Sequence, residues 1–280
     1  VFGFDGSTSI PEDEKYDVDI TFEAQETSFK NILSLVPSIY LTDFEQLKTS
    51  GSLAFDGFAK GTYQEDQIPA FAFNLKVNDG FFQYPELPES IHDVNIDFSA
   101  TNKDGNLDNT VVNLKNMHLE LGKNPIQISA LIKNLVNYDM EANVKAKVNL
   151  GDVAKMYPIE GTELKGILSA DISAQGVYDS TMNKIPTVQA MLSLVDGYVK
   201  SSEFPKAIEN ININSSIISE GTINNTTVDV NKFSLVLDDE QFNSSLHLSE
   251  LDDVHYKMDF NGVIDIDKML AIYPVEDMTV

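Results

Sequence analysis

Apolar and polar residues alternate along much of this chain. Tyr16, Val18, Ile20 and Phe22 stand two residues apart, and many later stretches keep the same phase. Successive side chains of a β-strand point to opposite faces, so a period of two gathers the apolar residues on one face. The pattern predicts antiparallel strands that each have one apolar face and one wetter face.

Three segments depart from this alternation. In each, four apolar residues fall at i, i+3, i+4 and i+7, the spacing that places them on one face of a helix. Each also has a capping residue before it and a proline after it, so we expect three short α-helices. The apolar positions are Phe29, Ile32, Leu33 and Val36; Leu150, Val153, Ala154 and Tyr157; and Ile266, Met269, Leu270 and Tyr273. The caps and prolines are Ser28 and Pro37, Asn149 and Pro158, and Asp265 and Pro274.

Other tracts recur at a similar spacing. Asp79 to Ile91 returns 117 residues later as Asp196 to Ile208, with an Asp-Gly, a Pro and an Ile at matching distances. The glycine-bounded tract 51–61 likewise matches 166–176. Recurrence at a fixed spacing indicates a repeat architecture. Since Asp-Gly favours tight turns, we expect a hairpin turn at each Asp-Gly.

The recurring elements divide the chain into three parts. Residues 1–48 form a partial repeat with a strand and a capped helix, residues 49–163 a first repeat, and residues 164–280 a second repeat that stops where another should begin. Each repeat of about 116 residues would hold roughly seven antiparallel strands and one short helix. We predict a mainly β fold, an elongated and curved antiparallel sheet that forms an open groove or half-barrel. We expect one continuous array cut from a larger protein.

Charge and composition exclude several classes of function. The net charge is -25, with 44 acidic residues against 19 basic ones. Such a chain repels phosphate backbones, so we expect no nucleic-acid partner, and it disfavours an anionic membrane surface. The chain has no cysteine, which excludes disulfides and thiolate sites. No apolar run approaches the roughly 20 residues that span a bilayer, so we expect membrane attachment only through a segment outside this chain.

Candidate chemistry is sparse. The four histidines lie outside any metal-binding motif, so we expect surface positions without a metal ion; they are His92, His118, His247 and His255. The stretch 102–108 is faintly similar to a calcium loop, but its glycine is misplaced and we expect a polar turn. The acidic runs 238–240 and 252–253 fall in expected turns, where carboxylates stay solvated. We therefore predict no enzyme activity, catalytic residue, metal or cofactor.

The apolar face of the sheet is the remaining candidate site. It is either an ordinary core covered by the helices, or a groove that stays open for an apolar ligand. The groove candidates are Leu53, Phe55, Phe71, Phe73, Leu75, Val77, Leu168, Val188, Leu192 and Leu194.

Several motifs together resemble a known family. They are a capped helix that ends in Tyr157-Pro158, the run Leu-Lys-Gly-x-Leu-x-Ala-Asp from Leu164 to Asp171, the pair Ile185-Pro186, and Asp-Gly followed by Pro-x-x-Ile. In this combination the chain, from about Ser28 onward, resembles the AsmA-like family of Gram-negative envelope proteins.

The resemblance implies a protein tethered to the inner membrane, with its bulk in the periplasm and a role in outer-membrane assembly and lipid homeostasis. The related TamB-like and bridge-like proteins have a β-groove that shields lipid tails. A phospholipid or another apolar lipid would be the ligand, envelope proteins possible partners, and no catalytic motif is transferred. The alternative is a surface β-repeat binding module, an adhesin or glycan binder, although the chain has no Trp for a sugar-stacking platform.

Overall fold

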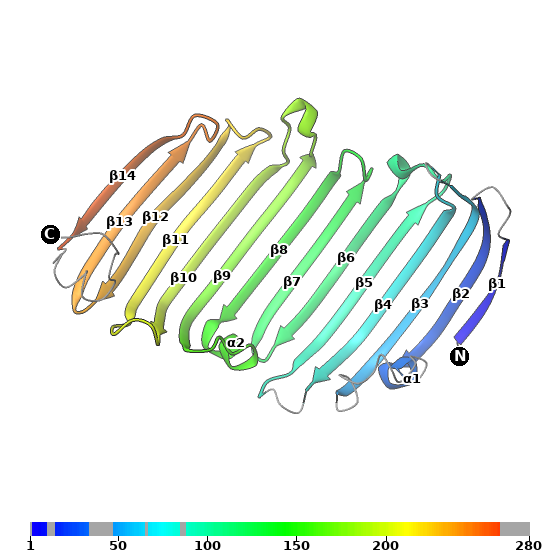
Figure 1. Cartoon of the computed structure of the whole chain (residues 1–280), viewed down its shortest axis with the longest axis horizontal. Helices are drawn as coiled ribbons and strands as arrows, with labels where there is room; N and C mark the ends of the chain where they lie inside the picture. Colours follow the sequence, from blue (N-terminus) through cyan, green and yellow to red (C-terminus); the bar gives the residue numbers. More distant parts are fainter. Residues whose placement is uncertain (1, 10–14, 34–46, 65–66, 85–87, 264–280) are drawn as a thin grey trace. The chain divides into compact units, whose positions relative to one another are not determined.

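The computed structural model describes residues 2–9, 15–33, 47–64, 67–84 and 88–263. The structure is mainly β, with 73% of residues in strands, which form one open antiparallel sheet. The order of the strands in the sheet follows their order in the chain (Figure 1). This confirms the predicted mainly β antiparallel class, whereas the repeat length of about 116 residues stays a prediction.

The strands range from 8 to 16 residues in length. Their bounds are β1 Phe2–Ser9, β2 Tyr16–Ser28, β3 Lys48–Tyr63, β4 Ala70–Gln83, β5 Ile91–Asn102, β6 Val111–Leu121, β7 Asn124–Lys133, β8 Asp139–Asn149, β9 Thr162–Val177, β10 Thr187–Ser201, β11 Ile208–Glu220, β12 Thr226–Leu237, β13 Glu240–Ser249 and β14 His255–Gly262. The helices are α1 Phe29–Leu33 and α2 Leu150–Met156, with short 3-10 turns at η2 Leu107–Asn109 and η3 Ser180–Met182.

The chain divides into two compact units. The first comprises Val1–Lys145 and Ser173–Pro186, and the second Ala146–Ile172 and Thr187–Val280. Within the first unit, β1 to β7 pair consecutively and antiparallel. Within the second, β10 to β14 do the same. Each of these runs is a simple meander, which short polar turns between long strands permit.

Two of the three predicted helices fall in the described residues. α1 begins after Ser28, whose Oγ accepts a hydrogen bond from the backbone N–H of Asn31 at 3.3 Å. α2 begins after Asn149, whose Oδ1 accepts from the N–H of Gly151 at 2.9 Å. Both caps were predicted and both are confirmed, because a side-chain oxygen replaces the missing intrahelical partner. Val36, Pro37 and the third helix lie outside the described residues.

Roughly seven strands per repeat were predicted. Among the described residues, six strands, β3 to β8, lie between α1 and α2, and six more, β9 to β14, follow α2. The strand β1 was not expected. Its sequence, Phe-Gly-Phe-Asp-Gly-Ser-Thr-Ser, has few β-formers, and pairing with β2 rather than local propensity holds it in the sheet.

The Asp-Gly pairs are not hairpin turns, and this prediction is corrected. Asp79 and Gly80 lie inside β4, where the register against β5 shifts on both sides of Gly80. Asp79 has a φ of 49°, in the left-handed region. An extra residue in that conformation is a β-bulge, which bends the strand and changes which face the following side chains occupy. Asp-Gly supplies the same positive φ as a turn would, so local sequence cannot distinguish the two.

A single asparagine holds this bulge. Oδ1 of Asn95 on β5 accepts from the N–H of Asp79 at 3.2 Å, and its Nδ2 donates to the carbonyl of Asp93 at 2.9 Å. Asp93 has a φ of 51° and forms a second register shift on β5, against β6. Gly51 on β3 faces the bulge so closely that a Cβ there would lie 2.4 Å from the Asp79 carbonyl oxygen. The recurring glycine is therefore required by close backbone approach.

The same arrangement recurs in the second unit. The N–H of Asp196 donates to Oδ1 of Asn212 at 3.3 Å, and Nδ2 of Asn212 donates to the carbonyl of Asn210 at 2.8 Å. Asp196 and Asn210 again have positive φ values, of 51° and 49°. These are the partners found in β4 and β5, each 117 residues further along the chain. The recurrence in sequence thus corresponds here to recurrence of hydrogen-bond geometry.

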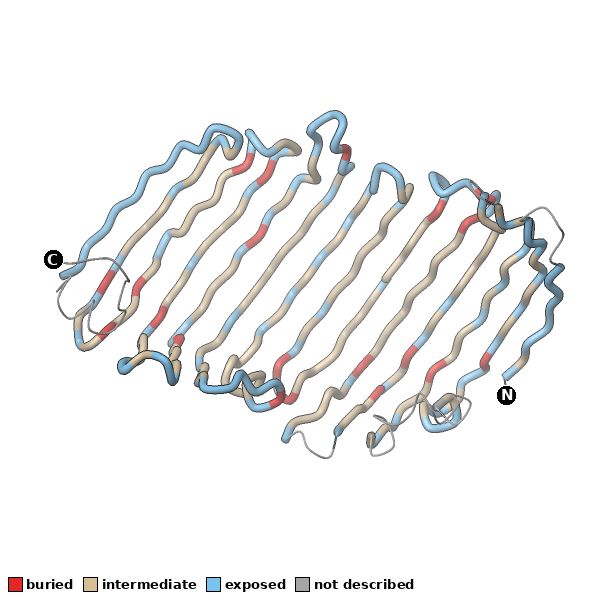
Figure 2. The backbone as a smooth tube through the Cα atoms, viewed as in Figure 1, coloured by how far each residue is buried: buried red, intermediate tan, exposed pale blue. Residues whose placement is uncertain are grey.

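The buried core is small. Most strand residues of the described chain are intermediate in exposure and few are buried (Figure 2). Among the described residues, the buried apolar ones are few, such as Ala24, Leu53 and Met156.

Candidate functional site

Six of the ten groove candidates share one face of the first unit. The antiparallel register places Leu53 opposite Val77 and Phe55 opposite Leu75 across β3 and β4. Directly paired residues point to the same face, and so do residues two apart on one strand. Phe71 and Phe73 lie four and two residues before Leu75 on β4, so their side chains point to the same face as Leu75 and Val77. We call this surface the first apolar face.

A row of phenylalanines crosses this face from β1 to β5. Successive ring centroids are 6.1 Å apart for Phe2 and Phe55, 6.2 Å for Phe55 and Phe22, 6.1 Å for Phe22 and Phe73, and 6.0 Å for Phe73 and Phe98. All four ring pairs are tilted, and ring contacts at such distances add to the stability of the sheet. Phe2, Phe22 and Phe98 were not among the predicted site residues. Their strand alternation was visible in the sequence, but which strands are neighbours was not.

Gly57 makes room for this row. A Cβ at this position would lie 2.6 Å from the ring of Phe22 and 2.5 Å from the backbone oxygen of Ala72. The ring of Phe22 therefore occupies the space that a side chain at position 57 would fill. The glycine keeps the row continuous.

Helix α1 covers only one end of the first apolar face. Phe29 of α1 meets Phe82 edge-on at 4.8 Å, and both pack on a cluster formed by Leu53, Val77 and Val94. These three residues are 7%, 5% and 6% exposed, so this end is a true core. Phe71, Phe73 and Phe98 lie outside that cluster and are only half-buried. The covered-core reading thus applies to the end of the face under α1.

The other four candidates lie in the second unit. Val188, Leu192 and Leu194 follow one another on one face of β10. Leu168 on β9 shares that face, because a Cβ on Gly166, two residues earlier, would lie 3.1 Å from a methyl carbon of Leu194. Leu168 is 39% exposed. We call this surface the second apolar face.

The second apolar face is less apolar than the first. On β11, Ser219 stands opposite Val188, Ser215 opposite Leu192 and Ile213 opposite Leu194. The described part of this unit has one ring pair on this face, Phe242 and Phe260 at 6.2 Å. It therefore offers less apolar surface than the first apolar face.

The opposite side of the first unit is polar. Lys60 pairs with Asp19 at 2.8 Å, and Thr62 donates to Asp17 at 2.7 Å. Phe58 is an exception, with 41% of its surface exposed on this side.

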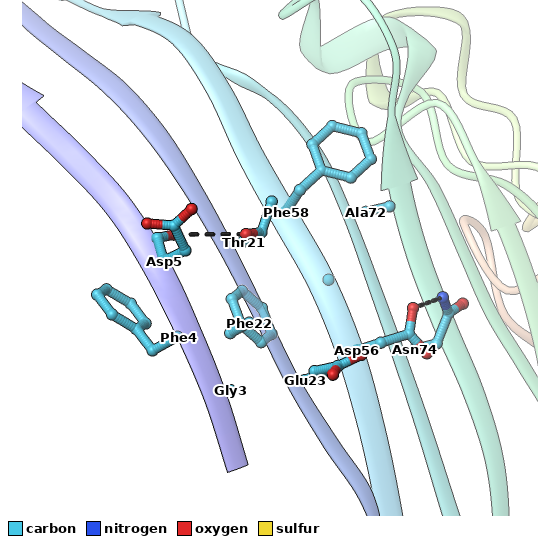
Figure 3. Close-up of a pocket in the computed structure, with 11 residues that line it drawn as sticks. Gly3, Phe4, Asp5, Thr21, Phe22, Glu23, Asp56, Phe58, Ala72 and Asn74 are labelled. Atoms are coloured by element: carbon cyan, nitrogen blue, oxygen red, sulfur yellow. Dashed lines mark hydrogen bonds between the residues drawn. The ribbon is translucent and has the colours of Figure 1, made fainter. Parts of the chain in front are cut away.

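An open hollow of about 600 Å³ lies beside Phe58, and Figure 3 shows its lining. Within it, Asn74 donates to Asp56 at 2.9 Å, and the Thr21 hydroxyl donates to the Asp5 carbonyl at 3.4 Å. Glu23 stands directly opposite Asp56 in the register, so two like charges face each other across the sheet. The hollow is open, and its lining combines the acidic side chains of Asp5, Glu23 and Asp56 with the apolar Phe4 and Phe22.

The stretches expected to be turns are turns. In 102–108, Asp104 accepts hydrogen bonds from the N–H of Asn106 and the side-chain amide of Asn109. Both of its carboxylate oxygens therefore make hydrogen bonds within the loop. Asp238 and Asp239 form the β12–β13 hairpin turn, with φ values of 49° and 66°. Asp238 also pairs with Lys206 at 2.6 Å.

Three of the histidines occupy strand surfaces. His247 lies 2.6 Å from Asp229, and His255 lies 3.1 Å from Glu250. His118 stands opposite Asn95 and Gln127 in the register. The fourth, His92, has a different setting that is described below.

Comparison with protein families, with curated proteins and with solved structures finds no match. No helix among the described residues is long and apolar enough to cross a membrane. The resemblance to the AsmA-like family therefore rests on the sequence motifs alone.

Proposed function

We propose that this protein is a non-enzymatic lipid-handling protein that shields acyl chains on its apolar faces. The observation that carries this proposal is the half-buried phenylalanine row of the first apolar face. An exposed apolar surface of this extent on a strongly charged chain is unfavourable in water, so selection for solubility alone would not retain it.

The dimensions of the first apolar face suit an acyl chain. The phenylalanine row crosses five strands, β1 to β5, whose four spacings of about 4.8 Å make it about 19 Å long. One leaflet of a bilayer has a hydrocarbon thickness of about 15 Å, half of the roughly 30 Å core. Burial of each methylene contributes about 0.8 kcal/mol. The face can therefore cover a whole chain, which non-directional burial would hold without a specific polar contact.

The sequence resemblance supplies the rest of the proposal. It would place the protein in the periplasm, tethered to the inner membrane by a segment outside this chain, in outer-membrane assembly or lipid homeostasis. A phospholipid would be the ligand, and envelope proteins would be partners.

Photocrosslinking tests the proposal directly. A photoactivatable phenylalanine analogue is placed at Phe73, in the row, or at Phe58, on the polar side. Each protein is irradiated in cells of a Gram-negative host and analysed by mass spectrometry. We expect lipid adducts at position 73 and at least tenfold fewer at position 58. Equal yields at the two positions, or none at 73, would overturn the proposal.

A second measurement separates lipid shielding from glycan binding. The purified chain is offered a fluorescent fatty acid, and Phe73→Asp is compared with Phe58→Asp, which adds the same charge on the other side. We expect Phe73→Asp to lose most of the uptake and Phe58→Asp to keep it. Unchanged uptake in both variants, together with hits on a glycan array, would favour the adhesin alternative.

A further inference from the structure

His92 lies beside two carboxylates at the bulge of β5. The register pairs His92 with Glu120 of β6, so the two side chains are neighbours on one face of the sheet. Asp93 follows directly, and its φ of 51° turns its carboxylate back toward His92, with Oδ2 at 2.9 Å from Nδ1. One potential ligand atom from each of the three residues lies within 4.8 Å of the others. In a regular strand, Asp93 would point to the opposite face.

The other ring nitrogen of His92 is already held. Nε2 lies 2.6 Å from the carbonyl oxygen of Gly122, to which it donates its proton. Histidines that bind metals almost always donate their second N–H to a carbonyl or carboxylate, which fixes the ring and leaves the first nitrogen for the metal. Here that arrangement aims Nδ1 at the two carboxylates.

The charge around His92 favours a cation. The carboxylates of Asp93 and Glu120 both lie beside the ring of His92. Their negative charges would stabilise a divalent ion bound there.

We propose that His92, Asp93 and Glu120 form a binding site for a divalent transition-metal ion, with zinc as the representative probe. One nitrogen and two carboxylate oxygens are ligands that zinc accepts, and water would complete a tetrahedral shell. Ligand atoms of such a shell are about 3.4 Å apart, so half-exposed side chains need only small adjustments. Magnesium and calcium prefer shells made entirely of oxygen and would bind weakly. The ion would tie β5 to β6.

The second unit provides an internal comparison. Its positions 117 residues after His92 and Asp93 are Glu209 and Asn210, and Val236 stands opposite Glu209 as Glu120 stands opposite His92. The backbone is similar, with Asn210 at a φ of 49°. However, Glu209 replaces the imidazole, and neither Asn210 nor Val236 carries a carboxylate. We therefore expect one site per chain.

The site lies on the side of the sheet away from the phenylalanine row. Ile91 and Val94 flank the His92–Asp93 pair and pack in or against the cluster under α1, on the first apolar face. His92 and Glu120 point the other way. Metal binding is therefore independent of the lipid proposal, and either can fail without the other.

Calorimetric titration of the tag-free full chain, stripped with a chelator, tests this site with zinc chloride. We expect one zinc per chain, at least tenfold weaker binding in both His92→Gln and Glu120→Gln, and no competition from magnesium or calcium. His247→Gln is the matched control, since His247 has a single carboxylate partner at 2.6 Å, and it should bind like the wild type. Circular dichroism of each variant checks the fold, which the isosteric Glu120→Gln should preserve.

Three results would overturn the proposal. They are no measurable zinc binding by the wild type, unchanged affinity in His92→Gln and Glu120→Gln, or an equal loss in His247→Gln. A gain-of-function variant sharpens the test: Glu209→His, Asn210→Asp and Val236→Glu together should raise the stoichiometry to two. A stoichiometry that stays at one would show that the bulge and register do not suffice to build the site.

Discussion

Asn102 is the most completely buried polar residue among those described, and it organises the loop between β5 and β6. It is 0% exposed. Its amide donates to the carbonyl of Asn106 at 2.6 Å and to the hydroxyl of Thr110 at 2.8 Å, while its oxygen accepts from the N–H of Gly105 at 2.7 Å. A buried polar group is tolerated because every partner is satisfied.

Its counterpart in the second unit is not satisfied. Ser219 stands opposite Val188 as Asn102 stands opposite Phe71, and it is 1% exposed. Its hydroxyl oxygen has no hydrogen-bond partner in the described part of the chain. The buried polar residue at this strand end therefore makes three hydrogen bonds in the first unit, whereas its counterpart in the second unit has a hydroxyl without one.

Alanine substitution should change the free energy of unfolding differently at Asn102 and at Ser219. Asn102→Ala leaves buried partners without a hydrogen bond and should lower the free energy of unfolding by about 2–3 kcal/mol. Ser219→Ala removes an unsatisfied hydroxyl, so it should change that free energy by less than about 0.5 kcal/mol or stabilise slightly. Urea denaturation measures both. Equal losses would mean that the loop network around Asn102 carries no special stability.

Asp179 gives a pH-dependent prediction at the same scale. Hydrogen bonds from the Thr181 hydroxyl, at 2.6 Å, and from the backbone N–H groups of Thr181 and Met182 lower the pKa of its carboxyl, against the opposing effect of burial. A lowered folded-state pKa contributes stability that is present above the unfolded value, near 3.9, and is lost as pH falls through the folded value.

The η3 turn should therefore loosen only in acid. The protection factors of the Thr181 and Met182 amides, which correct for the intrinsic pH dependence of exchange, should stay constant above about pH 4 and fall progressively below it. Thr181→Val removes the strongest hydrogen bond, so the midpoint of Asp179 titration, followed by NMR, should move upward. A midpoint unchanged by Thr181→Val would assign the lowered pKa to another cause.

At the scale of elements, the sequence predicted the helices and strands whose signals lie within their own residues. A cap, an apolar stripe and a following proline were enough to place the starts of α1 and α2, because a helix makes its hydrogen bonds within itself. The alternation in β4 likewise predicted its apolar face. The Asp-Gly at position 79 predicts a turn from local sequence alone. The amide of Asn95, which holds the bulge instead, lies on another strand and cannot be read locally.

The bulge should depend on that amide. Asn95→Ala removes the acceptor for the Asp79 N–H and the donor to the Asp93 carbonyl, so it should cost about 1–2 kcal/mol. Asn212→Ala should have a similar effect in the second unit. Asn74→Ala is the matched control on β4, because its exposed hydrogen bond to Asp56 should contribute at most about 0.5 kcal/mol. Urea denaturation would contradict the assignment if all three variants lost the same stability.

At the scale of the whole molecule, composition and periodicity predicted the mainly β class and the apolar side of each candidate residue. They did not predict which strands are neighbours. The phenylalanine row requires β1 beside β2 and β2 beside β3, and the cluster at His92 requires Glu120 opposite it. Both depend on the register in which the strands pair. A shift of that register by one residue would move every side chain of a strand to the opposite face of the sheet. The signal for His92, a His-Asp pair and a Glu 28 residues later, has meaning only once that register is known.

The net charge of -25 also acts on the molecule as a whole. Carboxylates such as Glu23 and Asp56 stand opposite each other on the polar side, so self-repulsion opposes folding. Raising sodium chloride from 0.01 to 0.1 M shortens the Debye length from about 30 to about 10 Å, so the urea midpoint should rise. Glu23→Gln should raise the free energy of unfolding at low salt by a few tenths of a kcal/mol, and it should reduce the salt dependence of the urea midpoint. A midpoint that falls with salt would mean that attractive ion pairs such as Lys60 with Asp19 outweigh the repulsion.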